Sequence, residues 1–220
     1  MQKYISKLMR LFLEPSKFIK SVSKEKDYWE ITKFFAVSYV FVLLITLILS
    51  ALITLRMGSS LSIENTLREF AIGILYAFAV PYVGSALMHA GVWIFEGRQG
   101  YFNTFKPVTY GFVLYLIYNL FSVLTTGIMQ LVKPIYPGTP YSQTHATVIV
   151  VIAGLFALTG SIIALYTQTI GVSLYQKISK GKAFLGIILI PLISIIVIYL
   201  LVLIILTKLG FETILSQGII

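Results

Sequence analysis

The sequence predicts an all-α fold, a polytopic integral membrane bundle of five helices with a short amphipathic N-terminal segment. Five apolar stretches carry this prediction, because about 20 helical residues cross a bilayer core of about 30 Å. Charged residues make up 11% of the 220-residue chain and hydrophobic residues 58%, which is far from the balance of a soluble domain. Apolarity within each stretch is continuous rather than alternating, which favours helices over barrel strands. The stretches are 34–55, 70–95, 107–132, 146–171 and 183–206.

The N-terminal segment, residues 1–33, is basic and amphipathic. Ile5, Leu8 and Phe12 recur at helical spacing within 3–13, while Lys and Arg occupy other faces. Pro15 suits the first turn of a second short helix. We expect this segment to lie on the cytoplasmic membrane surface. The alternative is an ordinary juxtamembrane segment whose charges only fix the topology.

The net charge of +9 is distributed unevenly between the two ends of the predicted bundle. Thirteen Lys and Arg residues fall in 1–33 and in the loops 96–106 and 172–182, against four on the other side. Cytoplasmic loops carry the excess of Lys and Arg in membrane proteins. The N-terminus is therefore predicted to be cytoplasmic and the C-terminal tail, 207–220, external. This explanation makes a nucleic-acid partner unnecessary, and we expect none.

The cytoplasmic end of the predicted bundle is positively charged and aromatic. We expect it to contact anionic lipid headgroups, each well-placed Lys or Arg contributing about 1 kcal/mol, or a protein partner not identified by the sequence. The alternative is that these charges only orient the chain. The candidate contact residues are Lys3, Lys7, Arg10, Arg98, Tyr101, Lys106, Lys177, Lys180 and Lys182.

Two polar residues inside the spans form a candidate intramembrane site. His89 lies near the cytoplasmic end of the second span, and its ring is expected to be neutral and hydrogen-bonded. Asn119 lies near the middle of the third span, where a buried amide needs partners on other helices. Structural hydrogen bonds are one interpretation of both residues, and the lining of a cavity is the other.

Small residues and prolines indicate how the spans pack. Ala153, Ala157 and Ser161 recur every four residues in the fourth span and predict a face at the centre of the bundle. Packing within one chain and a homo-oligomer are both compatible with such a face. Pro81 and Pro191 are expected to bend the second and fifth spans.

Groups that would carry catalysis are missing from the sequence. No acidic residue lies within a span, so no proton relay or cation site of an ion-coupled transporter is apparent. The chain has no cysteine, and its two histidines are far apart in the sequence, which argues against a metal site. No Walker motif, nucleophile elbow or His-Glu-x-x-His occurs. We therefore predict no catalytic residue, no cofactor and no metal.

Several loop and span residues form a recognisable pattern: Pro15, Phe18, His89, Gly97, Gly100, Phe102, Thr104, Tyr110, the 175–183 loop and Pro191. In these residues the chain resembles the Yip family of small five-span membrane proteins, named for interaction with Ypt/Rab GTPases, in one of its prokaryotic branches. The resemblance implies a non-enzymatic role in a membrane, which here would be a prokaryotic cell membrane. Its N-terminal segment lacks the long acidic-aromatic region of eukaryotic members, so their GTPase binding is not carried over.

These observations are compatible with three functions. The first is a scaffold or membrane-organising protein that binds lipids or a protein at its cytoplasmic face. The second is a small-solute transporter or channel subunit, with His89, Asn119 and the Pro81 bend lining its path. The third, a lipid-modifying enzyme, ranks last, because convergent acids or histidines at one membrane depth are missing.

Overall fold

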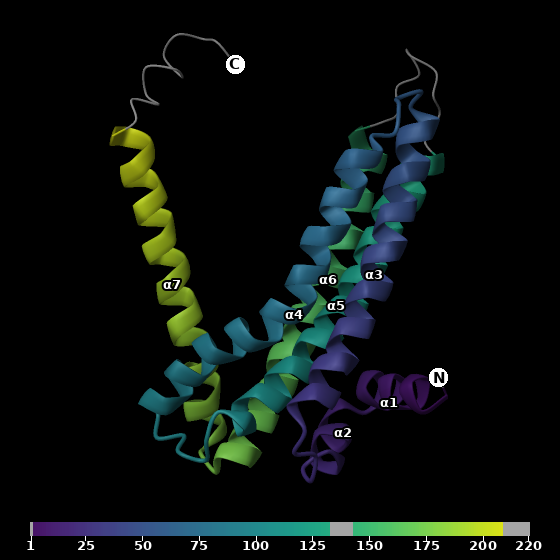
Figure 1. Cartoon of the computed structure of the whole chain (residues 1–220). Coiled ribbons are helices and arrows are strands. Elements are labelled where there is room, and N and C mark those ends of the chain that lie inside the picture. Colours follow the sequence, from purple (N-terminus) through teal and green to yellow (C-terminus); the bar gives the residue numbers. More distant parts are fainter. Residues whose placement is uncertain (1, 133–142, 209–220) are drawn as a thin grey trace.

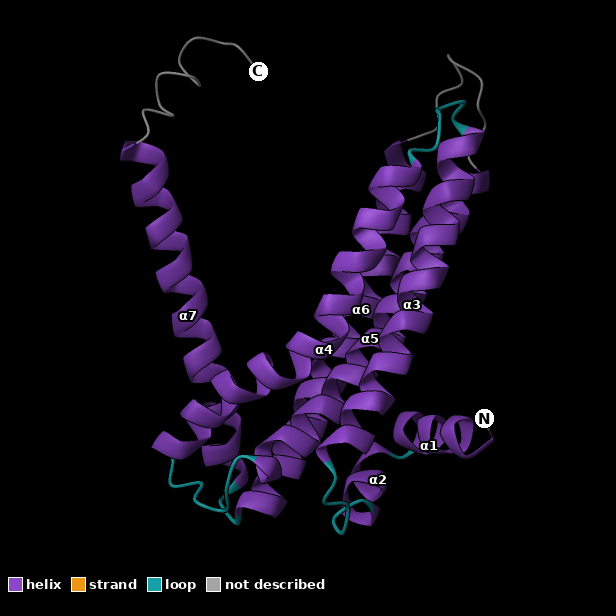
Figure 2. Cartoon of the chain, viewed as in Figure 1, coloured by secondary structure: helices purple, strands orange, loops and turns teal. Residues whose placement is uncertain are grey.

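The computed structural model describes residues 2–132 and 143–208. Over these residues the chain forms helices and no strand (Figure 2), which confirms the predicted all-α fold. Residues 209–220, most of the predicted C-terminal tail, lie outside the described part. The helices are α1 (Gln2–Leu13), α2 (Pro15–Ser21), α3 (Tyr28–Arg56), α4 (Ile63–Ile94), α5 (Phe102–Val132), α6 (Gln143–Gln176) and α7 (Lys180–Lys208).

Helices α3 to α7 are long and apolar enough to cross a membrane. Each extends beyond the apolar stretch that predicts it. Helix α6 continues to Gln176, although the predicted stretch ends at 171, and α5 begins at Phe102 rather than at 107. Hydropathy locates apolar residues, whereas the backbone hydrogen bonds carry a helix on into polar ones. The α3–α4, α4–α5 and α6–α7 loops are therefore shorter than the sequence predicts.

Local signals explain several helix ends. The Asp27 carboxylate caps α3 by accepting from the Trp29 N–H at 2.8 Å, and the Ser62 hydroxyl caps α4 in the same way. Pro15 occupies the first turn of α2, where its missing N–H costs nothing. Helix α4 ends at Ile94, and Glu96 beyond it has a φ of 71°, so that the Gly97 N–H turns back to the Val92 carbonyl.

Helices α3 to α6 lie side by side, and α5 and α6 form the most extensive contact (Figure 1). Close approach at Gly160, which lies against the Tyr118 side chain, draws these two helices together. The sequence predicts that the fourth span turns its small residues toward the centre of the bundle. This is correct for Ala153, which is buried, and wrong for Ser161, which is exposed. A strict four-residue repeat drifts around a helix of 3.6 residues per turn, so the buried row continues through Ala164.

Helix α7 packs against the second half of α4 and then separates from the bundle (Figure 1). Helix α4 is bent, and Pro81 within it lacks the N–H that would continue its hydrogen-bond ladder. Gly91 and Gly186 lie at the crossing of α4 and α7. The residues of α7 beyond Pro191 are mostly exposed and apolar, as suits a helix surrounded by lipid.

The N-terminal segment belongs to the same core as the long helices. Leu11 from α1 and Ile19 from α2 are fully buried, and they cluster with Ile31, Phe105 and Tyr110 of α3 and α5. Helix α1 lies across the direction of the long helices, beside their lower ends in Figure 1. Both short helices are thereby fixed at one end of the bundle.

Candidate functional site

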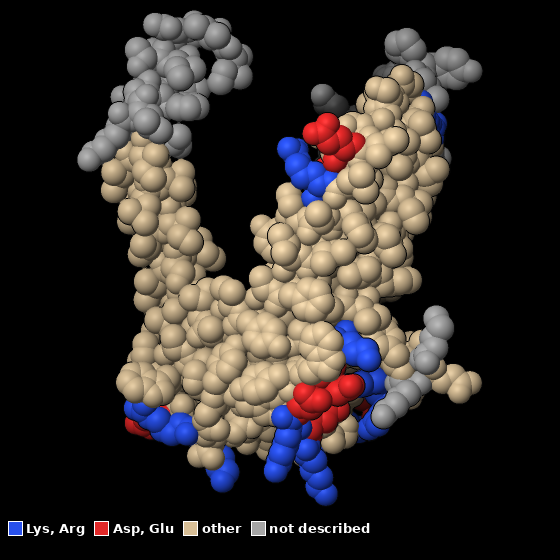
Figure 3. Space-filling model, viewed as in Figure 1, with Lys and Arg blue, Asp and Glu red and all other residues tan. Residues whose placement is uncertain are grey.

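Lys and Arg side chains gather at the end of the bundle formed by α1, α2 and the loops after α4 and α6 (Figure 3). We call this end the basic face. A smaller group of cations lies beside acidic residues at the other end of the molecule (Figure 3). The exposed cations of the basic face are Arg10, Lys17, Lys20, Lys24, Lys26, Lys33, Arg98, Lys177 and Lys180.

Helix α1 carries apolar residues on two sides. One side docks onto the bundle, where the Tyr4 hydroxyl and Ser38 Oγ lie 2.5 Å apart and the Tyr4 ring contacts Phe34. Burial raises the pKa of Tyr4 above its ordinary value, so its hydroxyl stays protonated at neutral pH. The other side is a stripe of Ile5, Met9 and Leu13, which are 50, 50 and 65% exposed. The residues that the structure describes leave half or more of each of these side chains uncovered.

Glu25 ties α1 to the bundle. Lys7 Nζ donates to Glu25 Oε1 at 2.9 Å, and the Tyr110 hydroxyl donates to Glu25 Oε2. The ammonium group of Lys7 also lies over the rings of Phe34 and Tyr110, at 5.1 and 5.0 Å. Lys7 is thus partly buried, and it holds α1 against the bundle. It is not the exposed lipid contact that the sequence predicts.

Lys106 is buried, with 1% of its surface exposed. Its Nζ donates to the backbone carbonyls of Val22, Ser23 and Glu25 at 3.2, 2.9 and 2.6 Å. The prediction that Lys106 faces headgroups is therefore wrong. Hydropathy placed it in a loop, but it lies in the second turn of α5, on the side that faces the α2–α3 connection. There it pairs with the carbonyls of Ser23 and Glu25 in the connection, and shares the Val22 carbonyl with the Glu25 N–H.

A polar network joins the α4–α5 loop to the end of α6. The Gln176 side chain accepts from the Gln99 N–H at 2.9 Å and donates to the Gly100 carbonyl at 2.8 Å and to Thr104 Oγ1 at 2.9 Å. Gly100 has a φ of 86°, a conformation that glycine adopts without strain. The loop is held rigidly over α6 as a result.

His89 belongs to this network. Its Nδ1 lies 2.9 Å from Thr104 Oγ1. Gln176 donates to the same oxygen, and a hydroxyl oxygen can accept two hydrogen bonds and donate one, so both neutral tautomers of His89 fit this contact. The hydrogen bond expected for His89 is therefore present, and the neighbour is Thr104. The rings of His89 and Tyr101 also pack edge to face, with 5.6 Å between their centroids.

Tyr101 is half-buried rather than presented outward. Its hydroxyl donates to the Tyr82 carbonyl at 2.8 Å, and its ring stacks with Tyr28. Burial, with smaller contributions from Tyr28 and Tyr82, raises the pKa of Tyr101 to about 12. The side chain is therefore neutral and held in place at neutral pH, as a structural part of the basic face.

The remaining candidates of the two loops lie at the surface. Arg98 lies over the Trp93 ring at 4.2 Å, and Lys182 pairs with Glu96. The hydrogen bond and charge of Lys182 lower the pKa of the exposed Glu96 carboxyl. The small contribution of this pair to stability is thus present above the ordinary carboxyl pKa and is lost as the pH falls through the lowered one.

Two candidates stand apart from these networks. Asn119 is half-buried in α5, and its side chain has no hydrogen bond to any residue in the described ranges, unlike the inter-helix bond expected for it. His89 and Asn119 do not form one polar site, because His89 is paired with Thr104 and no described hydrogen bond joins it to Asn119. The side chain of Lys3 lies outside the described part of the structure.

Sequence reasoning missed Glu25, Gln176 and Gln168. Glu25 is an acid within a run of lysines, Gln168 is an amide within the predicted fourth span, and Gln176 follows that span by five residues. These were the signals that could have found them. Within residues 2–132 and 143–208, no group of three His, Cys, Asp or Glu residues is placed to hold a metal ion.

The fold and the apolar surfaces of its five long helices define a polytopic α-helical membrane protein. A family model described as the Yip1 domain matches residues 9–203, nearly the whole chain, and the chain belongs to this family. The match does not distinguish branches of the family, so it gives no support to the prokaryotic branch. Comparison with curated proteins and comparison with solved structures each give no match.

Proposed function

We propose that this protein is a non-enzymatic membrane-organising scaffold whose basic face binds anionic lipid headgroups. The observation that carries the proposal is the exposed apolar stripe of α1, Ile5, Met9 and Leu13, on a helix fixed across the bundle at its basic end. A helix with apolar residues on one side and cations nearby is suited to lie in the plane of a membrane surface. Membership of a family not known for enzymatic activity supports the non-enzymatic role.

The charges of the basic face supply the lipid preference. Its exposed lysines and arginines come from three separate segments, which the core and the Gln176 network hold together. Anionic headgroups are attracted by about 1 kcal/mol per well-placed Lys or Arg. By the positive-inside rule, the basic face and the N-terminus are on the cytoplasmic side in this proposal, with the C-terminus outside.

No specific observation favours the alternatives. A solute path would require convergent polar groups, but His89 is engaged with Thr104 and Asn119 lies far from it along the chain. A homo-oligomer would need a surface other than the small-residue face of α6, because Gly160 and Ala164 are buried within the chain. A protein partner at the basic face remains an outcome of the experiments below.

A fluorophore on α1 tests whether the exposed apolar stripe of this helix contacts the membrane. The chain has no cysteine, so Met9→Cys gives a single attachment site for an environment-sensitive dye in liposomes. We expect blue-shifted emission and quenching by lipids with a spin label high in the acyl chain, because residue 9 faces the membrane. Lys17→Cys, on the exposed side of α2, is the matched control and should report water. Equal, water-like emission from both positions would remove the in-plane helix.

Neutralising exposed lysines should reduce the enrichment of anionic lipid. In nanodiscs with mixed phosphatidylcholine and phosphatidylglycerol, Lys20→Gln and Lys180→Gln should each weaken the retention of phosphatidylglycerol by about fivefold, equivalent to about 1 kcal/mol. Arg68→Gln removes one charge from the opposite end and should have no effect. Native mass spectrometry counts the retained lipids. Retention that is insensitive to both lysine variants would favour a protein partner instead.

A further inference from the structure

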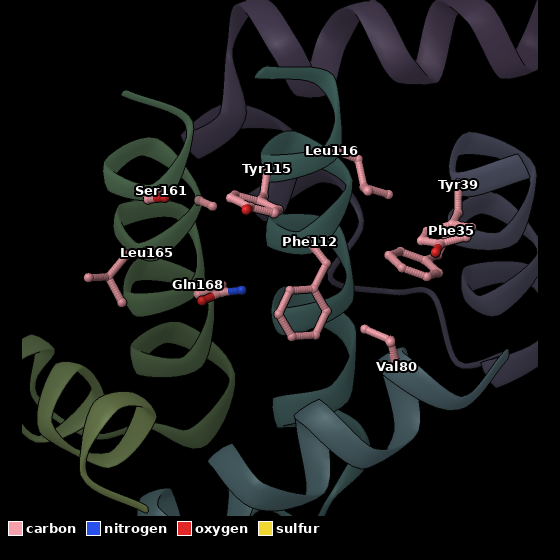
Figure 4. A pocket seen from close by; sticks show the side chains of 10 residues that line it. Phe35, Tyr39, Val80, Phe112, Tyr115, Leu116, Ser161, Leu165 and Gln168 are labelled. Atoms are coloured by element: carbon pink, nitrogen blue, oxygen red, sulfur yellow. The ribbon is translucent and has the colours of Figure 1, made fainter. Parts of the chain in front are cut away.

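A pocket opens between α3, α4, α5 and α6, in the half of the bundle nearer the basic face. Its volume is about 400 Å³, which lies in the range of sites for small ligands. The walls are mainly apolar and include Phe35 from α3, Val80 from α4, and Phe112 and Leu116 from α5 (Figure 4). Such walls suit a hydrocarbon ligand, and no residue proposed for lipid binding at the basic face lines them.

Gln168 provides a polar group in this apolar pocket. Only 4% of its surface is exposed, and its Nε2 donates to the Val108 carbonyl at 3.2 Å. No group in the described ranges donates to its Oε1. Gly111 makes this position possible, because a Cβ there would come within 2.7 Å of Nε2. Figure 4 shows the amide extending from α6 toward Phe112 on α5.

Two tyrosine hydroxyls around the pocket also lack partners. Tyr39 and Tyr115 line it, and neither hydroxyl makes a hydrogen bond to another residue in the part of the chain that the structure describes. Ser161, also on the lining, instead donates to the Ala157 carbonyl of its own helix at 2.9 Å. A polar group without a partner in a membrane interior is costly. The pocket thus pairs apolar walls with three groups that a ligand could satisfy.

The surroundings of the pocket select the kind of ligand. All four helices that line it are candidate membrane spans, so a ligand would enter from the bilayer. Gln168 lies eight residues before the end of α6, about 12 Å along the helix, at a depth where a charged headgroup would be expensive. A hydroxyl group, by contrast, donates one hydrogen bond and accepts others.

We propose that this pocket binds a neutral lipid bearing a hydroxyl group. The hydrocarbon part fills the space between Phe35, Phe112 and Leu116, and the hydroxyl donates to Gln168 Oε1 while accepting from a tyrosine. This site is separate from the basic face. Its existence does not depend on the scaffold function, and either proposal can fail without the other.

Photolabelling of the full chain in nanodiscs tests the site. The probe is octadecanol with a diazirine in its chain, in zwitterionic lipid. We expect adducts on the peptides of α5 and α6 that line the pocket. Ser161→Phe should reduce them to background, because Ser161 is exposed and a large ring there blocks the opening. The control is Leu158→Phe, at an exposed position of the same helix outside the pocket lining, which should label like the wild type.

A second pair of measurements tests the hydrogen bond. The methyl ether of the probe has no donor, so the wild type should label about fivefold less strongly with the ether than with the alcohol. Gln168→Leu should label equally with both. Adducts spread evenly over the exposed faces of α4 and α7, or equal labelling of the wild type by alcohol and ether, would overturn the proposal.

Discussion

Replacing Lys106 with methionine should loosen the N-terminal segment from the bundle. Methionine fills a similar volume but has no donor for the carbonyls of Val22, Ser23 and Glu25, which lie 3.2, 2.9 and 2.6 Å from Lys106 Nζ. The Val22 carbonyl keeps the Glu25 N–H as a donor at 3.0 Å, but the carbonyls of Ser23 and Glu25 lose the ammonium group, and an unpaired buried acceptor costs about 1–3 kcal/mol. We expect a destabilisation of several kcal/mol, concentrated in the α2–α3 connection rather than spread over the molecule.

Hydrogen exchange in nanodiscs measures this directly. Amides of residues 14–27 should exchange faster in Lys106→Met, while those in the middle of α5 and α6 should keep their protection. Lys180→Met is the matched control, because it removes the same charge from an exposed position. Unchanged exchange of 14–27 in Lys106→Met would show that the three carbonyls do not depend on the ammonium group.

A methyl group at Gly91 should separate α4 from α7. An alanine Cβ there would overlap the backbone carbonyl oxygen of Gly186, and the opposing backbone cannot rotate away as a side chain can. Overpacking of this kind costs about 1–3 kcal/mol. We expect Gly91→Ala to lower the unfolding temperature and to increase the distance between the two helices.

Spin labels report the distance. Pairs introduced at Leu87→Cys and Leu192→Cys, both at exposed positions, place one label on α4 and one on α7. Gly154→Ala is the control, because a Cβ at that helical glycine meets nothing within 4 Å. Gly91→Ala with the label distance and unfolding temperature of the wild type would contradict the close crossing. The same change at Gly154 should be neutral or slightly stabilising.

Sequence pattern alone does not show which of the candidate contact residues are exposed and which are buried. Arg98, Lys177 and Lys180 are exposed as predicted, because a cation in a short loop has few ways to be buried. Lys7, in the amphipathic segment, pairs with Glu25, and Lys106, at the end of a predicted loop, pairs with backbone carbonyls. Sequence pattern does not distinguish the two groups, since the partners lie up to 84 residues away.

The amino-acid sequence by itself determined the number of long helices, the two short N-terminal ones and the uneven charge. These features depend on local hydropathy, helical periodicity and capping residues such as Asp27. Only the tertiary structure decided which polar residues are buried together, where α4 crosses α7, and that Gln168 opens into a pocket. Those properties depend on side chains that meet across helices, and hydrophobicity along one span contains no information about its neighbours.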